Sequence, residues 1–186
     1  MRCVACRPFV PRWCSLRHTM KSPPDSQAAV TLRAHRVGDM GWIVHRQAVL
    51  YAQEYGWNAE FEALLAEIAA RFLRRFDAAR ERCWVAEQGG AIVGAVFLVR
   101  RTPTCAQLRM LYVEPGVRGH GLGARLVREC TAFARAAGYR KIRLWTNSGL
   151  SAARQLYVRE GYRKVSEDPH HSFGHHLVGE TWDLKL

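Results

Sequence analysis

The sequence lacks any long hydrophobic run. No stretch approaches the roughly 18 consecutive apolar residues that a membrane-spanning helix needs, so we expect no membrane partner. Near the N-terminus, the longest uncharged run is too short for the apolar segment of a secretory signal. We therefore expect a cytoplasmic protein whose six cysteines stay reduced. Internal repeats and low-complexity tracts are also missing, which excludes a repeat architecture.

The sequence contains few acidic residues relative to basic ones. The chain contains 28 Lys and Arg but only 16 Asp and Glu, which gives a formal net charge of +12. Nucleic-acid binding would explain such an excess, yet the basic residues are scattered, with few runs longer than two. A diffuse excess suits an anionic cofactor or an acidic partner as well as it suits DNA. A nucleic-acid partner is therefore disfavoured.

Sustained periodicity is absent from residues 1–29, which mix Arg, Cys, Pro and Ser. We predict a disordered extension there, or one that precedes a true start at Met20. The series Cys3, Cys6, Cys14 and His18 offers four soft ligands to zinc, but its spacing matches no common finger and no second half follows, so we expect no metal. With 48% apolar residues, the chain can form one well-buried domain, which we assign to residues 30–186.

Apolar spacing predicts the elements of this domain. Four helices are expected, at residues 42–55, 58–76, 122–138 and 150–160. Seven strands are expected, at residues 30–36, 83–87, 91–99, 108–113, 141–146, 162–165 and 181–186, with a loop at 168–173. Gln88-Gly89-Gly90 indicates a tight hairpin, and residues 100–106 are expected to be a turn that leads into strand 108–113. Because a helix connects strands 108–113 and 141–146, these two should lie parallel in a βαβ unit.

The turn Arg118-Gly119-His120-Gly121-Leu122-Gly123 joins strand 108–113 to the next helix. Glycines at alternate positions let a ligand approach the backbone, and the free N–H groups of a first helical turn attract anions. A phosphate or pyrophosphate group is therefore the expected ligand of this turn. The alternative is a flexible turn with close strand–helix packing.

Two motifs in this order resemble the GNAT superfamily of N-acetyltransferases over residues 30–186. One is Arg-Gly-x-Gly-Leu-Gly at 118–123 after a strand that ends Val-Glu-Pro, and the other is Leu-Tyr-x-x-x-Gly-Tyr at 156–162. The chain also resembles the acetyltransferase half of fusions between a MarR-type regulator and a GNAT domain, in the sequence of residues 41–57 and in the ending PHHSFGH…VGETWDL. The winged-helix half of those fusions has no counterpart in this sequence. The resemblance implies an α/β fold with a central mixed sheet of about seven strands flanked by about four helices.

The resemblance also implies acetyl-coenzyme A (acetyl-CoA) as acetyl donor. In this family the strand before the glycine turn splays from its parallel neighbour and pairs with pantetheine, which here assigns Leu111, Tyr112 and Val113 to the cofactor. The glycine turn is assigned to the pyrophosphate through Arg118, Gly119, His120, Gly121, Leu122, Gly123 and Ala124. The family often has Asn seven residues before its tyrosine, but this chain has Leu150 there. The nearest asparagine, Asn147, lies earlier, just past strand 141–146, and we transfer the cofactor contact of the family's asparagine to it.

Tyr157 matches the family tyrosine that protonates the departing thiolate, a role that a phenol with pKa near 10 can fill. The alternative is a core tyrosine. Glu114, beside the glycine turn, is a candidate base for the attacking amine, as are Glu54, His45, His171 and His175. Residues expected near the amine substrate are Tyr51, Glu54, His171 and His175.

The function implied is transfer of an acetyl group to a primary amine, by direct attack in a ternary complex, on a small molecule or a protein. The alternative is a binding module that senses acyl-CoA and acts through a protein partner. Cys105 and Cys130 have no readable His/Asp partner, which argues against a covalent intermediate. The identity of the amine and the oligomeric state, including a homodimer, are left open.

Overall fold

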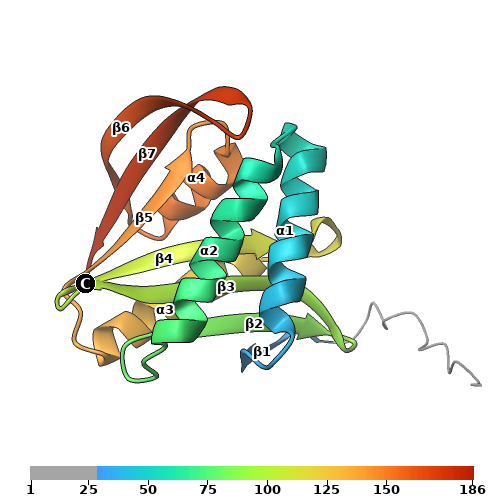
Figure 1. The fold of residues 1–186 in the computed structure, drawn as a ribbon. Coiled ribbons are helices and arrows are strands. Elements are labelled where there is room, and N and C mark those ends of the chain that lie inside the picture. The colour runs from blue at the N-terminus through green and yellow to red at the C-terminus, as the bar shows by residue number, and fades with distance from the viewer. Residues whose placement is uncertain (1–28) are drawn as a thin grey trace, which may run out of the picture.

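A mixed β-sheet of seven strands runs through residues 29–186, the part of the chain that the computed structural model describes (Figure 1). The strand order is β1-β2-β3-β4-β5-β7-β6. The strands are β1 (Thr31–Ala34), β2 (Arg82–Gln88), β3 (Ala91–Thr102), β4 (Cys105–Val113), β5 (Lys141–Asn147), β6 (Arg163–Ser172) and β7 (His175–Lys185). The helices are α1 (Asp39–Tyr55), α2 (Ala59–Arg75), α3 (Leu122–Ala136) and α4 (Ser151–Arg159), with a 3-10 turn at Pro115–Val117.

The helices cover both faces of this sheet. Strand β2 shows why, because its side chains alternate between two separate apolar clusters: Cys83 and Val85 pack with α1 and α2, whereas Trp84 and Ala86 pack with α3 and α4. Figure 1 shows α1 and α2 on one side and α3 and α4 on the other. This layered arrangement confirms the mixed α/β fold expected from the sequence.

The predicted order of elements is confirmed, and so is the parallel βαβ pair, β4 with β5. The hairpin between β2 and β3 is also present. Two predictions were wrong. Residues 100–106 are mostly strand, because β3 and β4 are joined by only two residues, Pro103 and Thr104.

The second wrong prediction is the loop at residues 168–173, which lies largely in strand β6, paired along its length with β7. Phe173 and Gly174 form the two-residue turn, with φ of 58° and 81°. Two positive φ values match the twist of a tight hairpin, but a phenylalanine is rarely found there. The aromatic ring explains the exception, because it is buried between Trp57 and Phe61 at centroid distances of 4.7 and 5.2 Å.

Strands β4 and β5 separate after a short paired segment. Pairing joins Cys105–Gln107 to Lys141–Arg143 and stops there. Further along β4, a β-bulge follows Arg109, where Met110 has φ of 50° and the register with β3 shifts by one residue. A bulge bends its strand. The backbone of β4 beyond Gln107 therefore diverges from β5, as the resemblance implied.

Two further observations concern the described residues alone. None of their helices is both long enough and apolar enough to cross a membrane. Cys83, Cys105 and Cys130 are buried free thiols, while the other three cysteines and the proposed zinc ligands lie outside the described residues, as does nearly all of the predicted extension.

Candidate functional site

The glycine turn before α3 adopts a backbone that only glycine takes readily. Gly119 and Gly121 have φ of 82° and 81°, and a Cβ built on either would meet no atom within 4 Å. Gly123 has a different role, because its Cβ would approach the Leu156 side chain to 3.2 Å. The first two glycines therefore shape the turn and keep it open, and the third permits close packing of α3 on α4.

The first turn of α3 presents backbone N–H groups. Gly121 is its N-cap without a side-chain hydrogen bond, and the first turn contains no acidic residue. Helical pairing begins with Arg125, whose N–H donates to the Gly121 carbonyl at 3.0 Å. The amides of Leu122, Gly123 and Ala124 precede it, so they lie at the positive end of the helix dipole. This arrangement is suited to a phosphate group.

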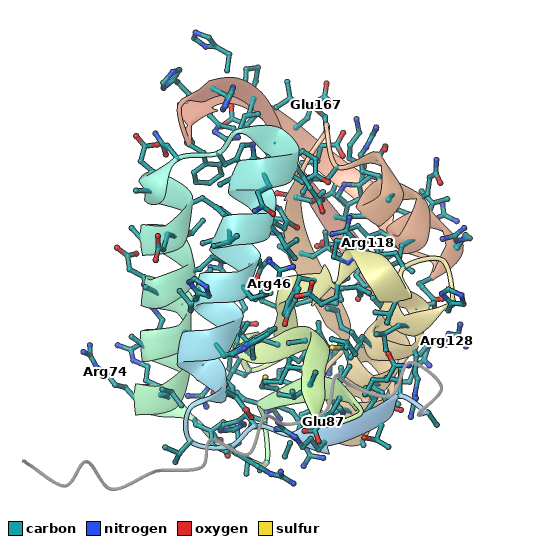
Figure 2. The ribbon with its side chains drawn as sticks, turned by 90° about the vertical axis from the view of Figure 1, so that its right-hand side faces the viewer. Arg46, Arg74, Glu87, Arg118, Arg128 and Glu167 are labelled. Atoms are coloured by element: carbon teal, nitrogen blue, oxygen red, sulfur yellow. The ribbon has the colours of Figure 1, made fainter. Side chains whose placement is uncertain are left out.

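A groove of about 570 Å³ runs from this turn toward the gap between β4 and β5. Its walls include every residue assigned from sequence to the cofactor except His120 and Asn147. Tyr51 and Glu54 of α1 form the opposite side. Glu54 is 2.9 Å from the guanidinium of Arg118, which also donates to the Val113 carbonyl at 2.9 Å. Figure 2 shows Arg118 on the face of the molecule that this groove opens onto, between α1 and Arg128 of α3.

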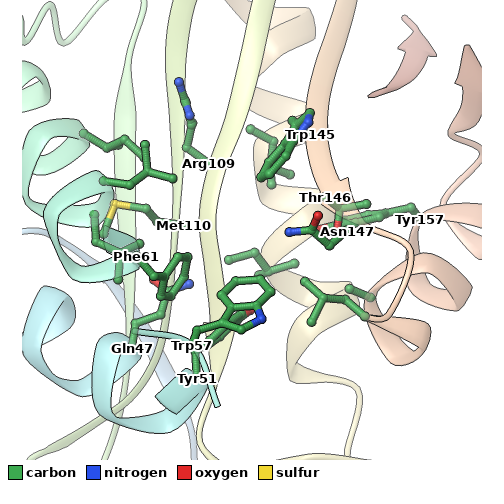
Figure 3. Close-up of a pocket in the computed structure, with 17 residues that line it drawn as sticks. Gln47, Tyr51, Trp57, Phe61, Arg109, Met110, Trp145, Thr146, Asn147 and Tyr157 are labelled. Atoms are coloured by element: carbon green, nitrogen blue, oxygen red, sulfur yellow. The ribbon is translucent and has the colours of Figure 1, made fainter. Parts of the chain in front are cut away.

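An inner cavity of about 90 Å³ continues from the groove into the gap between β4 and β5. The two share the walls formed by Tyr51, Leu111, Leu150 and Ala153. Residues from both faces of the sheet line the cavity, including Phe61 of α2 and Tyr157 of α4 (Figure 3). The splayed strands thus open a passage through the sheet, which closed strand pairing would have filled.

Tyr157 lines this inner cavity and is 5% exposed. Its ring packs in the core beside Tyr162 and Trp182, at centroid distances of 5.7 and 6.5 Å. Burial raises the pKa of its phenol above the ordinary value of 10.0. Tyr157 therefore keeps its proton through neutral and moderately alkaline pH, at a point that a ligand in the gap can reach.

Two buried polar atoms in the cavity wall have no hydrogen-bond partner among the described residues, Gln47 Oε1 and Asn147 Nδ2. Gln47 is 3% exposed and Asn147 is 1% exposed. The other amide atom of Asn147 is engaged, because Oδ1 accepts from His170 Nε2 at 3.1 Å, and His170 Nδ1 lies 3.0 Å from the Ser172 hydroxyl. An unpartnered polar atom in a core is costly, so a ligand is expected to complete both groups.

Glu114 does not line the groove or the inner cavity. Its carboxylate accepts two hydrogen bonds from Arg46 of α1, at 2.7 and 2.8 Å. Figure 2 shows Arg46 on α1. This bidentate pair ties α1 to the end of β4, and an occupied carboxylate is poorly suited to take a proton. The base assignment stays a prediction, for which this geometry supplies no support.

His171 and His175 do not line the two cavities either. They lie near the tip of the hairpin that β6 and β7 form. His175 Nε2 lies 3.0 Å from the Gly56 carbonyl, and the His171 ring contacts that of His176. Next to them, the Phe173 amide donates to Glu60 at 2.6 Å. The His175 and Phe173 contacts fasten the hairpin tip to Gly56, after α1, and to Glu60 of α2, whereas the His171 contact lies within the hairpin.

Sequence reasoning missed Gln47, Arg109 and Trp145, which also line the inner cavity. The sequence does contain a signal for Gln47 and Arg109, because each is a polar residue in an apolar pattern. Gln47 interrupts the apolar face of α1 between Ile43 and Leu50, and Arg109 interrupts the otherwise apolar and aromatic run of residues 108–113. A polar residue at a core position is an error unless it has a function.

Gly179 of β7 is expected to be indispensable for the position of Trp145. A Cβ there would lie 2.7 Å from the indole Nε1 and 2.9 Å from Cζ2. Gly179→Ala should therefore displace a cavity wall and destabilise the fold by about 1–3 kcal/mol, measured by denaturant unfolding. Gly149→Ala is the matched control, since a Cβ there meets nothing within 4 Å. Equal stability of both variants would contradict this packing argument.

The comparisons with known proteins agree with this geometry. A model of the Acetyltransferase (GNAT) family matches residues 46–162. Rat N-acetyltransferase family 8 member 2 is 34% identical over 122 residues, 63% of this chain and 49% of that protein. The chain thus spans about half the length of this relative. An uncharacterized N-acetyltransferase of Schizosaccharomyces pombe is 31% identical over 124 residues, 66% of this chain and 75% of that protein.

A solved structure shares the fold. It is that of a candidate acetyltransferase from Salmonella typhimurium with its cofactor acetyl-CoA. The TM-score is 0.65 at 23% identity, over 84% of this chain and 94% of that chain. The groove, the inner cavity and the splayed strands described above therefore sit on a fold that acetyltransferases use.

Proposed function

Because the chain belongs to the acetyltransferase (GNAT) family, we propose that it is an N-acetyltransferase that moves an acetyl group from acetyl-CoA to a primary amine. One observation carries the proposal. The groove at the glycine turn shares the walls Tyr51, Leu111, Leu150 and Ala153 with the cavity in the gap between β4 and β5, and Tyr157 lines that cavity. An elongated donor with phosphate at one end and a reactive thioester at the other suits such a passage.

The residues present fit acetyl-CoA. The open glycine turn and the free amides of Leu122, Gly123 and Ala124 suit its pyrophosphate. The β4 backbone past Gln107, unpaired with β5, can bond pantetheine amides as a missing strand would. The Asn147 amide, with Nδ2 unpartnered, can donate to a carbonyl near the thioester. When bound, the group supplies an activated acetyl and a thiolate leaving group.

Tyr157 acts as the general acid in this proposal. Its hydroxyl proton passes to the departing sulfur as the acetyl carbon bonds to the amine nitrogen, and the amine's proton leaves to solvent or a base. The raised pKa of the buried phenol keeps this proton available at neutral pH. Positioned acid catalysis of this kind contributes about 10²–10⁴-fold.

Direct attack by the amine in a ternary complex is favoured over a covalent thiol intermediate. Burial raises the pKa of the Cys83 and Cys130 thiols, so neither forms a ready thiolate. None of the three described cysteines, Cys83, Cys105 and Cys130, lines the groove or the inner cavity. Among the described residues, no cysteine is therefore placed to carry the acetyl group.

The alternative is an acyl-CoA sensor that acts through a protein partner, as the likeness to MarR/GNAT fusions suggests. A sensor needs the groove but has no need of a phenol in the inner cavity. The position of Tyr157 therefore favours the enzyme.

Calorimetric titration with acetyl-CoA, followed by a thiol-release screen against amines, tests the proposal. We expect saturable binding and release of free CoA with at least one primary amine. Binding without release by any amine would favour the sensor. Absence of binding would overturn the assignment of the groove.

A further inference from the structure

We propose that the amine substrate carries a carboxylate at a distance from its amine, that Arg109 binds this carboxylate, and that a short apolar linker between the two lies in the inner cavity. The inference rests on the proposed N-acetyltransferase function. It adds the chemical class of the acceptor, which neither family membership nor the fold determines.

Arg109 is a partly buried cation that pairs with no anion of the described residues. It lies on β4 two residues past the last pair with β5, and its side chain lines the inner cavity. Within residues 29–186 no acidic side chain pairs with it, and the charged groups that face it are Arg71 and Arg101. Burial, followed by these two like charges, lowers the pKa of its guanidinium. A guanidinium still stays charged at neutral pH, so an anion there would be strongly stabilising.

Other partly buried arginines of this chain show what Arg109 lacks. Arg33 contacts Asp39 at 2.6 Å, Arg46 contacts Glu114 at 2.7 Å and Arg143 contacts Asp183 at 2.6 Å. Each pairing raises the pKa of the arginine, whereas that of Arg109 is lowered. Each of these three guanidinium groups is thus neutralised by a carboxylate of the described residues, whereas Arg109 has none and is left for a ligand.

The phosphates of the acetyl donor cannot be that ligand. They are assigned to the glycine turn, and Arg109 does not line the groove that begins there. Figure 3 shows Arg109 and Trp145 at one end of the inner cavity and Tyr51 and Trp57 at the other. The anion that Arg109 binds therefore belongs to the second substrate. A carboxylate matches the planar, two-point donor geometry of guanidinium.

The rest of the cavity indicates the body of that substrate. The rest of its lining is mostly apolar and includes Leu64, Leu108 and Met110. At the far end from Arg109, Gln47 Oε1 is a buried acceptor that no described residue satisfies, and an amine N–H can donate to it. At 10–15 Å³ per water-sized group, about 90 Å³ holds roughly six to nine such groups. A straight-chain amino acid with its amine four or five carbons from its carboxylate has this size and both polar ends.

The test compares matched substrates on the full chain. Thiol release is measured with 5-aminopentanoate, with pentylamine, which lacks the carboxylate, and with glycine, whose amine and carboxylate are adjacent. We expect kcat/KM for 5-aminopentanoate to exceed that for each of the others by roughly tenfold to a hundredfold. Arg109→Gln should remove the advantage over pentylamine, and Arg109→Lys should restore part of it, with acetyl-CoA affinity unchanged in both. Arg101→Gln, outside the cavity lining, is the control and should keep the advantage.

Turnover of pentylamine as fast as that of 5-aminopentanoate, or an advantage that survives Arg109→Gln, would overturn the inference while leaving the acetyltransferase intact. A preference for glycine would overturn the separation of the two groups. Failure of the proposed function looks different, because then neither acetyl-CoA binding nor release with any amine would be seen in the unaltered protein. If Arg109→Gln fails to fold, the ratio in Arg109→Lys and in the unaltered protein still decides the matter.

Discussion

Gly121→Glu is expected to abolish acetyl-CoA binding. The position is the N-cap of α3 and opens onto the groove, with nothing within 4 Å of a Cβ. A glutamate there would place a negative charge in front of the first-turn amides, where the pyrophosphate is assigned. Calorimetric titration should show no binding at concentrations that saturate the unaltered protein.

Backbone strain must be separated from charge at this position, because Gly121 has φ of 81°. Gly121→Ala carries the strain of a left-handed residue, about 1–2 kcal/mol, without the charge, so it should weaken binding only in part. Gly116→Glu is the charge control, since Gly116 does not line the groove and a Cβ there meets nothing within 4 Å. Tight binding by folded Gly121→Glu protein would remove the glycine turn from the cofactor site.

Tyr157→Phe is expected to lower turnover by about 10²-fold or more while leaving acetyl-CoA affinity nearly unchanged. The substitution removes only the hydroxyl, and the ring keeps its contacts with Tyr162 and Trp182. Because burial raises the pKa of the phenol, the unaltered enzyme should lose no activity from this group as pH rises from 7 to 10. Steady-state kinetics over that range, with direct titration of the cofactor, measure both effects.

The matched control is Tyr162→Phe. Tyr162 contacts Tyr157 in the same core but lines neither the groove nor the inner cavity. Its loss of a hydroxyl should leave turnover close to that of the unaltered protein. Unchanged turnover in Tyr157→Phe with a good substrate, or an equal loss in both variants, would assign Tyr157 to packing alone.

Local chemistry explains how much of the fold was predictable. Apolar periodicity located all four helices and all seven strands, because a helix face and a strand face must each be buried wherever they lie in the fold. The predicted boundaries were less accurate at β6. Every residue of β6 is exposed or half-buried, so its sequence shows no alternation of apolar and polar residues that would mark the strand. Pairing with β7, and the burial of Phe173 at the turn, decide that hairpin instead.

By itself, the sequence determined the glycine turn and the start of α3 that we propose to hold the cofactor. Gly119, Gly121 and the start of α3 are adjacent in the chain, and the conformations of glycine and the free amides of a helix start follow from local geometry. The proposed acceptor side was decided only by the tertiary structure. Gln47 and Arg109 come from separate elements, and their shared cavity exists only because a bulge turns β4 away from β5. Whether a buried polar side chain has a hydrogen-bond or charge partner depends on which residues the fold places next to it. The spacing of residues along the chain does not determine those neighbours.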